Sequence, residues 1–178
     1  MAQAESFPFV VADPAFGEAS RLPYLPITLR LQDRSITVSS LLDTGSAVNV
    51  LPHEVGLQLG AVWEHQTTSV RLTGNLANEP ARVLTLMGSV VNLPSVRLVF
   101  AWTRVTGVPV ILGQVNFFIE FDVCFYRSRS IFEVKVKSAI QAWRLAQAAE
   151  HGRAGALRYR SNAVRGNELK YGVWYLGS

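Results

Sequence analysis

The residues with the clearest chemical potential lie in one short run, Leu42-Asp43-Thr44-Gly45-Ser46. A hydrolytic site can be built from two carboxylates that share one proton, one acting as base toward water while the other polarises a carbonyl. Gly45 would let the backbone turn tightly beside Asp43 and leave room for a substrate. Thr44 could bond the backbone across such a pair, and Ser46 could bond the outer oxygen of Asp43. The run therefore predicts a catalytic aspartate in an active-site loop.

The number of copies of this run limits the mechanism. The sequence contains one Asp-Thr-Gly and no Asp-Ser-Gly. A second carboxylate must then come from a second copy of the chain across a two-fold axis. The sequence predicts a homodimer with one active site per dimer.

The same residues are also compatible with roles outside this chemistry. Asp-Thr-Gly alone occurs by chance in about 3% of chains of this length, so Asp43 could simply be a turn residue. Ser46 could be a nucleophile served by His53 or His65, but no Gly-x-Ser-x-Gly is present. These two histidines and His151 are too scattered along the chain for a metal site. We predict no metal and no cofactor.

The elements before and after Asp43 are expected to fix its position. Leu25–Leu31 alternates apolar and polar residues, and a polar turn separates it from a second extended run, Ile36–Leu42. This hairpin places Asp43 at the end of a strand. Val48–Pro52 reads as extended, and His53–Leu59 could form one or two helical turns.

The rest of the chain to residue 137 is also typical of strands. A helical turn is expected at Gln114–Phe118. Short strands at close spacing favour a compact barrel or sandwich, so the predicted fold class is mainly β. The strands expected after residue 60 are Thr67–Leu72, Ala81–Met87, Ser89–Val91, Val96–Trp102, Val108–Leu112, Phe121–Phe125 and Ser130–Val136.

Two separated runs resemble a known family. Leu41–Ser46, taken with Val110–Gln114, resembles the retropepsin family of aspartic peptidases, and Leu112–Phe118 is similar to its bacterial members. The resemblance covers about residues 22–136. It implies a closed acid-protease-like β barrel with a short helix, in which Ile111-Leu112-Gly113 crosses the aspartate loop near the active site. Many members carry an Arg at the place of Gln114, where it helps to hold the dimer, and their chain termini contribute to the interface.

A β hairpin folding over the substrate is the other part that this family implies. The best candidate is the Arg71–Pro80 region, with a tip at Thr73, Gly74, Asn75 and Leu76. Glycine there suits a mobile lid, although it suits any hairpin turn equally well.

The two ends of the chain differ from its centre. Residues 1–21 are expected to be an irregular lead-in, 22–137 the β-barrel domain, and 138–178 a basic extension with a helix at Ser138–Glu150. Residues 1–126 carry 7 Lys/Arg against 10 Asp/Glu, whereas residues 127–178 carry 10 against 3. Basic charge favours polyanions, but no nucleic-acid motif accompanies it. A solvated tail is expected, and nucleic acid is not an expected partner.

The sequence lacks the marks of a membrane or secreted protein. No apolar run approaches the ~18 to 20 residues of a membrane span, and the first residues do not look like a secretory signal. Cys124 is the single cysteine, and its apolar neighbours predict a small buried residue. These features favour a reducing, cytoplasmic location and no membrane partner.

The leading hypothesis is a homodimeric aspartic endopeptidase. It would hydrolyse peptide bonds of an extended peptide or protein substrate with water activated by the paired Asp43 carboxylates. Two alternatives stay open: a non-catalytic peptide-binding or dimerisation module on the same fold, and an adaptor in which residues 138–178 carry the function.

Overall fold

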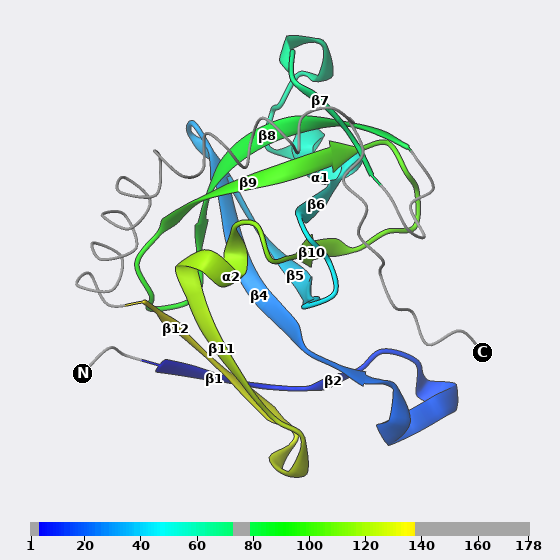
Figure 1. Ribbon diagram of the computed structural model, residues 1–178, viewed down its shortest axis with the longest axis vertical. Coiled ribbons are helices and arrows are strands. Elements are labelled where there is room, and N and C mark those ends of the chain that lie inside the picture. Colours follow the sequence, from blue (N-terminus) through cyan, green and yellow to red (C-terminus); the bar gives the residue numbers. More distant parts are fainter. Residues whose placement is uncertain (1–3, 73–78, 138–178) are drawn as a thin grey trace, which may run out of the picture.

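The structure is a computed structural model that describes residues 4–72 and 79–137 (Figure 1). Most of these residues lie in strands, as the alternating sequence pattern predicts. The strands are β1 (Ala4–Pro8), β2 (Val10–Val11), β3 (Arg21–Leu22), β4 (Tyr24–Leu31), β5 (Arg34–Leu42), β6 (Asn49–Pro52), β7 (Ser69–Arg71), β8 (Pro80–Ser89), β9 (Val96–Thr103), β10 (Val110–Leu112), β11 (Phe121–Tyr126) and β12 (Ile131–Val136). The helices are η1 (Pro14–Ser20), α1 (His53–Gln58), η2 (Trp63–His65), α2 (Phe117–Glu120) and η4 (Arg127–Arg129).

Six strands close into a barrel. Their order is β4-β5-β10-β6-β9-β8, and β8 pairs back onto β4, where Thr28 lies opposite Ser89. The pairs β5–β10 and β6–β9 are parallel and the other four are antiparallel. β7 extends the sheet beyond β8. The predicted mainly β fold with a closed barrel is confirmed.

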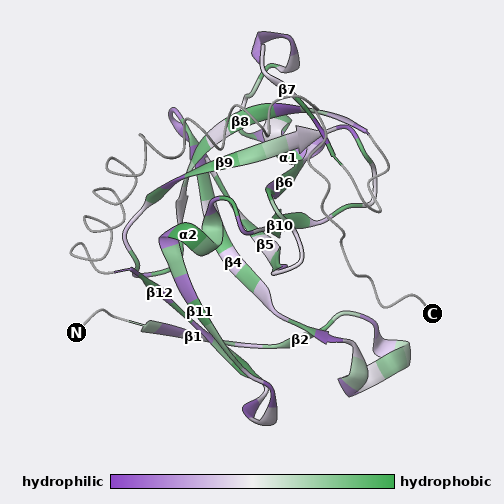
Figure 2. Cartoon of the chain, viewed as in Figure 1, coloured by the Kyte–Doolittle hydropathy of each residue, from purple (hydrophilic) through white to green (hydrophobic). Residues whose placement is uncertain are grey.

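The barrel core follows from the alternation in the sequence. In β4, Leu25, Ile27 and Leu29 are fully buried, while Pro26 and Arg30, on the other face, are exposed. Figure 2 shows the same alternation of hydrophobic and hydrophilic residues along the strands. Each fully buried Leu or Ile stabilises the folded chain by about 1.5–3 kcal/mol. The hydrophobic effect therefore fixes which face of β4 points inward.

Helix α1 forms where a helical turn was expected after Pro52. Its Gly56 packs against the barrel, because a Cβ there would lie 2.3 Å from Cε2 of Trp102. The indole Nε1 of Trp102 donates to the carbonyl of His53 at 3.1 Å. The absence of a side chain at position 56 lets the helix lie directly on β9.

A second sheet of three strands, in the order β1-β12-β11, lies beside the barrel. β1 pairs antiparallel with β12, from Ala4 opposite Lys135 to Pro8 opposite Ile131. We expected residues 1–21 to be irregular, but they contain β1, β2 and η1. The reason is that β1 is defined by a partner more than 120 residues away, which no local pattern reveals.

Two local expectations were wrong. Ala81–Met87 and Ser89–Val91 were expected to be separate strands, but β8 runs unbroken through Gly88 to Ser89. Glycine fits at position 88 because the strand passes close to Leu98 there: a Cβ would lie 2.6 Å from Cδ1 of Leu98. Cys124 was expected to be buried, yet it is exposed on β11, a strand that lies at the edge of its sheet.

The basic extension, with the helix expected at Ser138–Glu150, lies outside the described residues. Within the part that is described, none of the helices has the length and apolar character needed to span a membrane.

Candidate active site

Asp43 lies directly after β5, at one end of the barrel. Its backbone N–H donates to the carbonyl of Leu112 at 3.0 Å, which continues the parallel pairing of β5 with β10. The residue is half-buried, whereas the Leu42 side chain before it is only 4% exposed. The barrel therefore anchors the backbone and leaves the carboxyl group accessible.

The loop turns sharply after the aspartate. The Gly45 N–H donates to Oδ1 of Asp43 at 2.9 Å, and the Ser46 N–H donates to the Asp43 carbonyl at 3.1 Å. Thr44 and Gly45 are exposed. One carboxyl oxygen is thus held by the loop's own backbone, and this orients the other.

Ser46 has a different role from the one we expected. Its side chain is 4% exposed, and its hydroxyl donates to the carbonyl of Val48 at 2.8 Å. Because a hydroxyl has a single proton, Ser46 does not donate to Asp43 in this arrangement. It stabilises the turn of the loop instead.

The structure brings the Ile111-Leu112-Gly113 run and the aspartate loop together. After Gly113, the N–H of Gln114 donates to the Ser46 carbonyl at 2.8 Å and the N–H of Val115 to the Ala47 carbonyl at 2.7 Å. A Cβ at position 113 would lie 2.4 Å from the Val48 carbonyl oxygen. Only glycine lets the two backbones cross this closely.

Gln114 contacts the aspartate loop of its own chain. Its side-chain Nε2 donates to the Thr44 carbonyl at 2.8 Å. The side chain is exposed. At this position the amide side chain supports the aspartate loop within one chain.

Two asparagines at the crossing were missed by the sequence analysis. Asn49 is fully buried; its Oδ1 accepts from the Gly113 N–H at 2.8 Å and its Nδ2 donates to the Val99 carbonyl at 3.0 Å. Asn116 continues the network, accepting from the Val99 N–H and donating to the Arg97 carbonyl. The sequence did contain a signal for Asn49, because it is a polar residue within the apolar run Val48-Asn49-Val50-Leu51. A buried amide requires hydrogen-bond partners, so its position indicated a structural role.

The candidate flap is partly described. β7 and β8 form the stem of a hairpin in which Arg71 lies opposite Pro80, and the Leu72 N–H donates to the Glu79 carbonyl at 3.1 Å. The proposed tip, Thr73, Gly74, Asn75 and Leu76, lies outside the described residues.

An apolar pocket of about 120 Å³ lies between the aspartate loop and this stem. Val48 and Val115 line it from the crossing, Val70 and Leu72 from the stem, and Val99 from β9. Val48 is also the residue whose carbonyl accepts from Ser46. One wall of the pocket is therefore formed by the loop that follows Asp43.

Residues 4–72 and 79–137 contain no group of three His, Cys, Asp or Glu side chains placed to hold a metal ion. The arrangement offers one oriented carboxyl group, on a loop whose later residue Val48 lines an apolar pocket.

Comparison with known proteins supports the fold. No protein-family model matches the sequence, and no curated protein matches it. Among solved structures, the crystal structure of a retropepsin-like aspartic protease from Rickettsia conorii is similar, with a TM-score of 0.51. This chain has a retropepsin-like fold. The alignment covers 78% of this chain and 97% of the other, at 10% sequence identity.

The likeness to the Rickettsia conorii protein is a likeness of the whole fold. The alignment spans nearly the whole of the other chain, so the likeness includes the barrel and not merely one hairpin. At 10% identity it is a likeness of fold, and it says nothing by itself about activity. The function must be argued from the site.

Proposed function

We propose that this protein is an aspartic endopeptidase that works as a homodimer. The observation that carries the proposal is the position of Asp43: its backbone is anchored to Leu112, one carboxyl oxygen is held by the Gly45 N–H, and the residue stays half-exposed. The retropepsin-like fold is the scaffold in which this loop geometry would serve peptide hydrolysis.

The proposed reaction uses two Asp43 carboxyl groups that share one proton. The ionised group takes a proton from a bound water molecule, whose oxygen then attacks the peptide carbonyl carbon. The protonated group donates its proton to the carbonyl oxygen. The carboxyl group that took the water proton then passes it to the leaving nitrogen as the C–N bond of the tetrahedral diol breaks. The other carboxylate takes a proton from a diol hydroxyl, and that oxygen becomes part of the product carboxylic acid. Both carboxyl groups end the cycle as they began it.

A single chain lacks the second carboxyl group. The run Asp-Thr-Gly occurs once in the sequence, so each chain carries one such loop. An isologous dimer would supply the same loop from a second copy.

The substrate class follows from the surroundings of the loop. The apolar pocket lined by Val48, Val70 and Val115 suits an aliphatic or aromatic side chain. The β7–β8 stem could pair with an extended peptide through backbone hydrogen bonds. We therefore propose extended peptide segments with apolar side chains as substrates.

The decisive test compares Asp43→Asn with Asp33→Asn. Asp33 is an exposed aspartate in the β4–β5 turn, which makes it a matched control for removal of one negative charge. A mixed peptide library should be cleaved by wild type and by Asp33→Asn, and cleavage should fall by roughly 10³-fold or more in Asp43→Asn. A statine-type inhibitor should block the first two proteins.

Light scattering over a range of concentrations completes the test. A chain that remains monomeric at every concentration would overturn the peptidase, because Asp43 would have no partner. A dimer that binds library peptides but leaves them intact from acidic to neutral pH would favour the non-catalytic peptide-binding module. If truncation after Lys137 abolishes all partner binding, residues 138–178 carry the function.

A further inference from the structure

A small arm projects from the barrel before β4. We define the arm as residues 10–22, which comprise β2, η1 and β3 (Figure 1). Within the described part of the chain, β2 and β3 pair only with each other, Val10 opposite Leu22 and Val11 opposite Arg21. Helix η1 has no buried residue. The arm therefore adds little to the hydrophobic core of its own chain.

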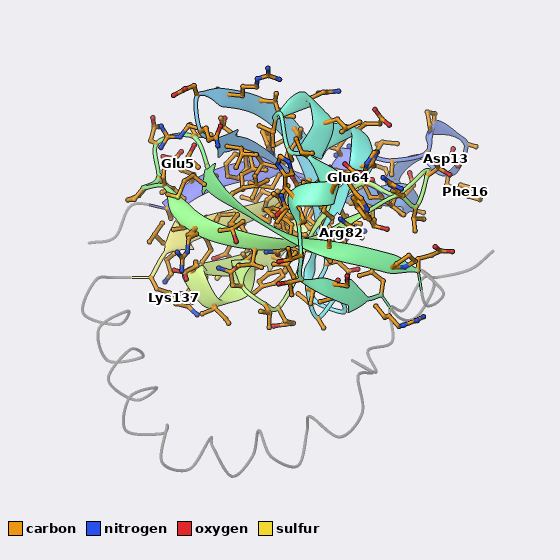
Figure 3. All side chains as sticks on the ribbon, turned by 90° about the horizontal axis from the view of Figure 1, so that it is seen from above. Glu5, Asp13, Phe16, Glu64, Arg82 and Lys137 are labelled. Atoms are coloured by element: carbon orange, nitrogen blue, oxygen red, sulfur yellow. The ribbon has the colours of Figure 1, made fainter. Side chains whose placement is uncertain are left out.

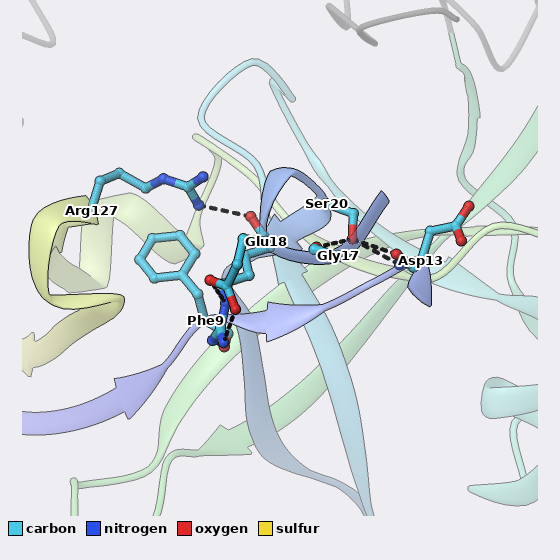
Figure 4. Close-up of polar contacts among 7 residues, drawn as sticks. Phe9, Asp13, Gly17, Glu18, Ser20 and Arg127 are labelled. Atoms are coloured by element: carbon cyan, nitrogen blue, oxygen red, sulfur yellow. Dashed lines mark hydrogen bonds and ion pairs between the residues drawn. The ribbon is translucent and has the colours of Figure 1, made fainter. Parts of the chain in front are cut away.

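The arm is nevertheless well ordered by polar contacts (Figure 4). The carboxyl group of Asp13 caps η1 by accepting from the Ala15 N–H at 2.8 Å. The Ser20 hydroxyl lies 2.8 Å from the carbonyl oxygens of both Asp13 and Gly17, and it accepts from the Asp13 N–H at 3.1 Å. These bonds tie the start of the arm's helix to its end.

Further contacts fix the arm to the body of the chain. Arg21 pairs with Glu18 and donates to the Phe9 carbonyl at 3.0 Å. Arg127, from η4 beside the β11–β12 turn, donates to the Arg21 carbonyl at 2.8 Å and lies over the Phe9 ring. The orientation of the arm relative to the barrel is thus set before any partner binds.

This ordered arm presents apolar side chains to solvent. Phe16 is 66% exposed, Val10 45% and Leu22 37%. Figure 3 shows Phe16 and Asp13 at one end of the molecule, far from Glu5 and Lys137. Exposed aromatic side chains on a rigid support suit binding, because little conformational entropy remains to be lost.

The arm joins the barrel next to the aspartate loop. Pro23, the residue after the arm, accepts at its carbonyl from the Leu42 N–H at 3.1 Å, and Leu42 precedes Asp43. A two-fold axis that brings two Asp43 residues together also brings both arms toward the interface. The terminal strand β12 is already paired on both sides within its own chain, by β1 and β11. The arm is thus an apolar surface next to the place where a second copy is required.

We propose that the arm is a dimerisation arm, and that Phe16 is buried against a second copy of the chain beside the paired Asp43 loops. This inference rests on the proposed function, since the second copy is required by the single aspartate. The arm would hold the partner close to the site that the partner completes.

The experiment compares Phe16→Ala with Val91→Ala by analytical ultracentrifugation. Val91 is 62% exposed and lies in the β8–β9 turn, so it controls for the loss of an exposed apolar side chain elsewhere. Phe16→Ala should raise the dimer dissociation constant by at least about 30-fold, and Val91→Ala should change it by less than about 2-fold. Helix η1 buries nothing, so circular dichroism should show both variants folded.

A photo-cross-linking amino acid at position 16 identifies what covers the arm. A cross-link between two copies supports the inference. A cross-link within one chain, to residues 138–178 for example, overturns it, as does a Phe16→Ala dimer as tight as wild type. If Phe16→Ala weakens the dimer but the wild-type protein cleaves no peptide, the dimerisation arm is supported and the peptidase proposal is overturned. If the protein cleaves peptides and Phe16→Ala leaves the dimer dissociation constant unchanged, the peptidase is supported and the dimerisation arm is overturned.

Discussion

The loop crossing at Asp43 and the arm over residues 10–22 are both held by several hydrogen bonds. The two regions differ in whether the residues around those bonds are buried. At the crossing, Asn49 is fully buried and the backbones approach so closely that position 113 has no room for a Cβ. In the arm, the polar network surrounds a helix with no buried residue, and Phe16 faces solvent. The packing of the first region is complete within one chain. The second holds in place side chains that stay largely exposed, Phe16 above all.

This difference decides how much each hydrogen bond contributes to the free energy of unfolding of the whole chain. A buried bond that is lost leaves an unsatisfied group away from water, which costs about 1–3 kcal/mol, whereas an exposed bond is replaced by water. Disruption of the crossing should therefore destabilise the whole chain. Disruption of the arm should affect local order and association, and leave the barrel intact.

The largest effect is expected from Gly113→Ala. The new Cβ would meet the carbonyl oxygens of Val48 and Ser46, at 2.4 and 2.7 Å, and neither backbone can move without opening the crossing. We expect a loss of about 3 kcal/mol or more in the free energy of unfolding, measured by urea denaturation.

Gly107→Ala is the control for that change. Nothing lies within 4 Å of a Cβ there, and the cost comes from its φ of +76°, which should amount to about 1–2 kcal/mol. Equal losses in the two variants would mean that the crossing is not tightly packed.

Asn49→Ala comes next. The change removes the acceptor for the Gly113 N–H and the donor to the Val99 carbonyl, and we expect a loss of about 2–3 kcal/mol in unfolding free energy. Asn92→Ala, at an exposed asparagine that bonds Glu5, should stay within about 0.5 kcal/mol of wild type. If both variants unfold at the same urea concentration as wild type, the buried network does not stabilise the barrel.

Ser20→Ala tests the arm. It removes the hydroxyl that links Asp13 and Gly17, and the local opening free energy of the arm should fall by about 1 kcal/mol. Hydrogen exchange of the arm amides should accelerate while exchange in β4 and β5 stays unchanged. Ser35→Ala, at an exposed serine in the β4–β5 hairpin, is the matched control. Faster exchange throughout the barrel would contradict the separation between the two regions.

The smallest effect is a pH dependence confined to the arm. The hydrogen bond from Arg21, followed by its positive charge, lowers the pKa of Glu18 below the ordinary value of 4.5. A lowered folded pKa means that the ionised carboxylate stabilises the arm fully above pH 4.5 and that this contribution disappears as the pH falls through the folded pKa. The protection factors of the arm amides, which are corrected for the intrinsic pH dependence of exchange, should therefore fall on acidification below pH 4.5. Glu18→Gln should remove this part of the pH dependence, and identical profiles for both proteins would count against it.

Barrel strands such as β4 could be predicted because each shows the alternation of apolar and polar residues within its own short sequence. Leu25, Ile27 and Leu29 alternate with outward residues, and the resulting strand was expected to within a residue of β4. The placement of Asp43 at a strand end followed from the same pattern. Alternation is local, so a single sequence is enough to show it.

The features that were missed depend on distant partners. β1 exists through its pairing with β12, and Asn49 acquires its role only when Gly113 and Val99 lie beside it. The arm was assigned to an irregular lead-in, and one contact that fixes its orientation comes from Arg127, which is 106 residues from Arg21. In each case the missing information was a long-range contact.

The pairing of β1 with β12 also has a consequence for biosynthesis. Ala4 cannot pair until Lys135, its partner in the sheet, has been synthesised, which takes roughly 7 to 26 s longer at about 5–20 residues per second. During that time Phe7 and Phe9, which are buried in the finished protein, have no β12 to cover them. The nascent chain therefore carries Phe7 and Phe9 without their β12 partner until nearly all of the described residues have been made.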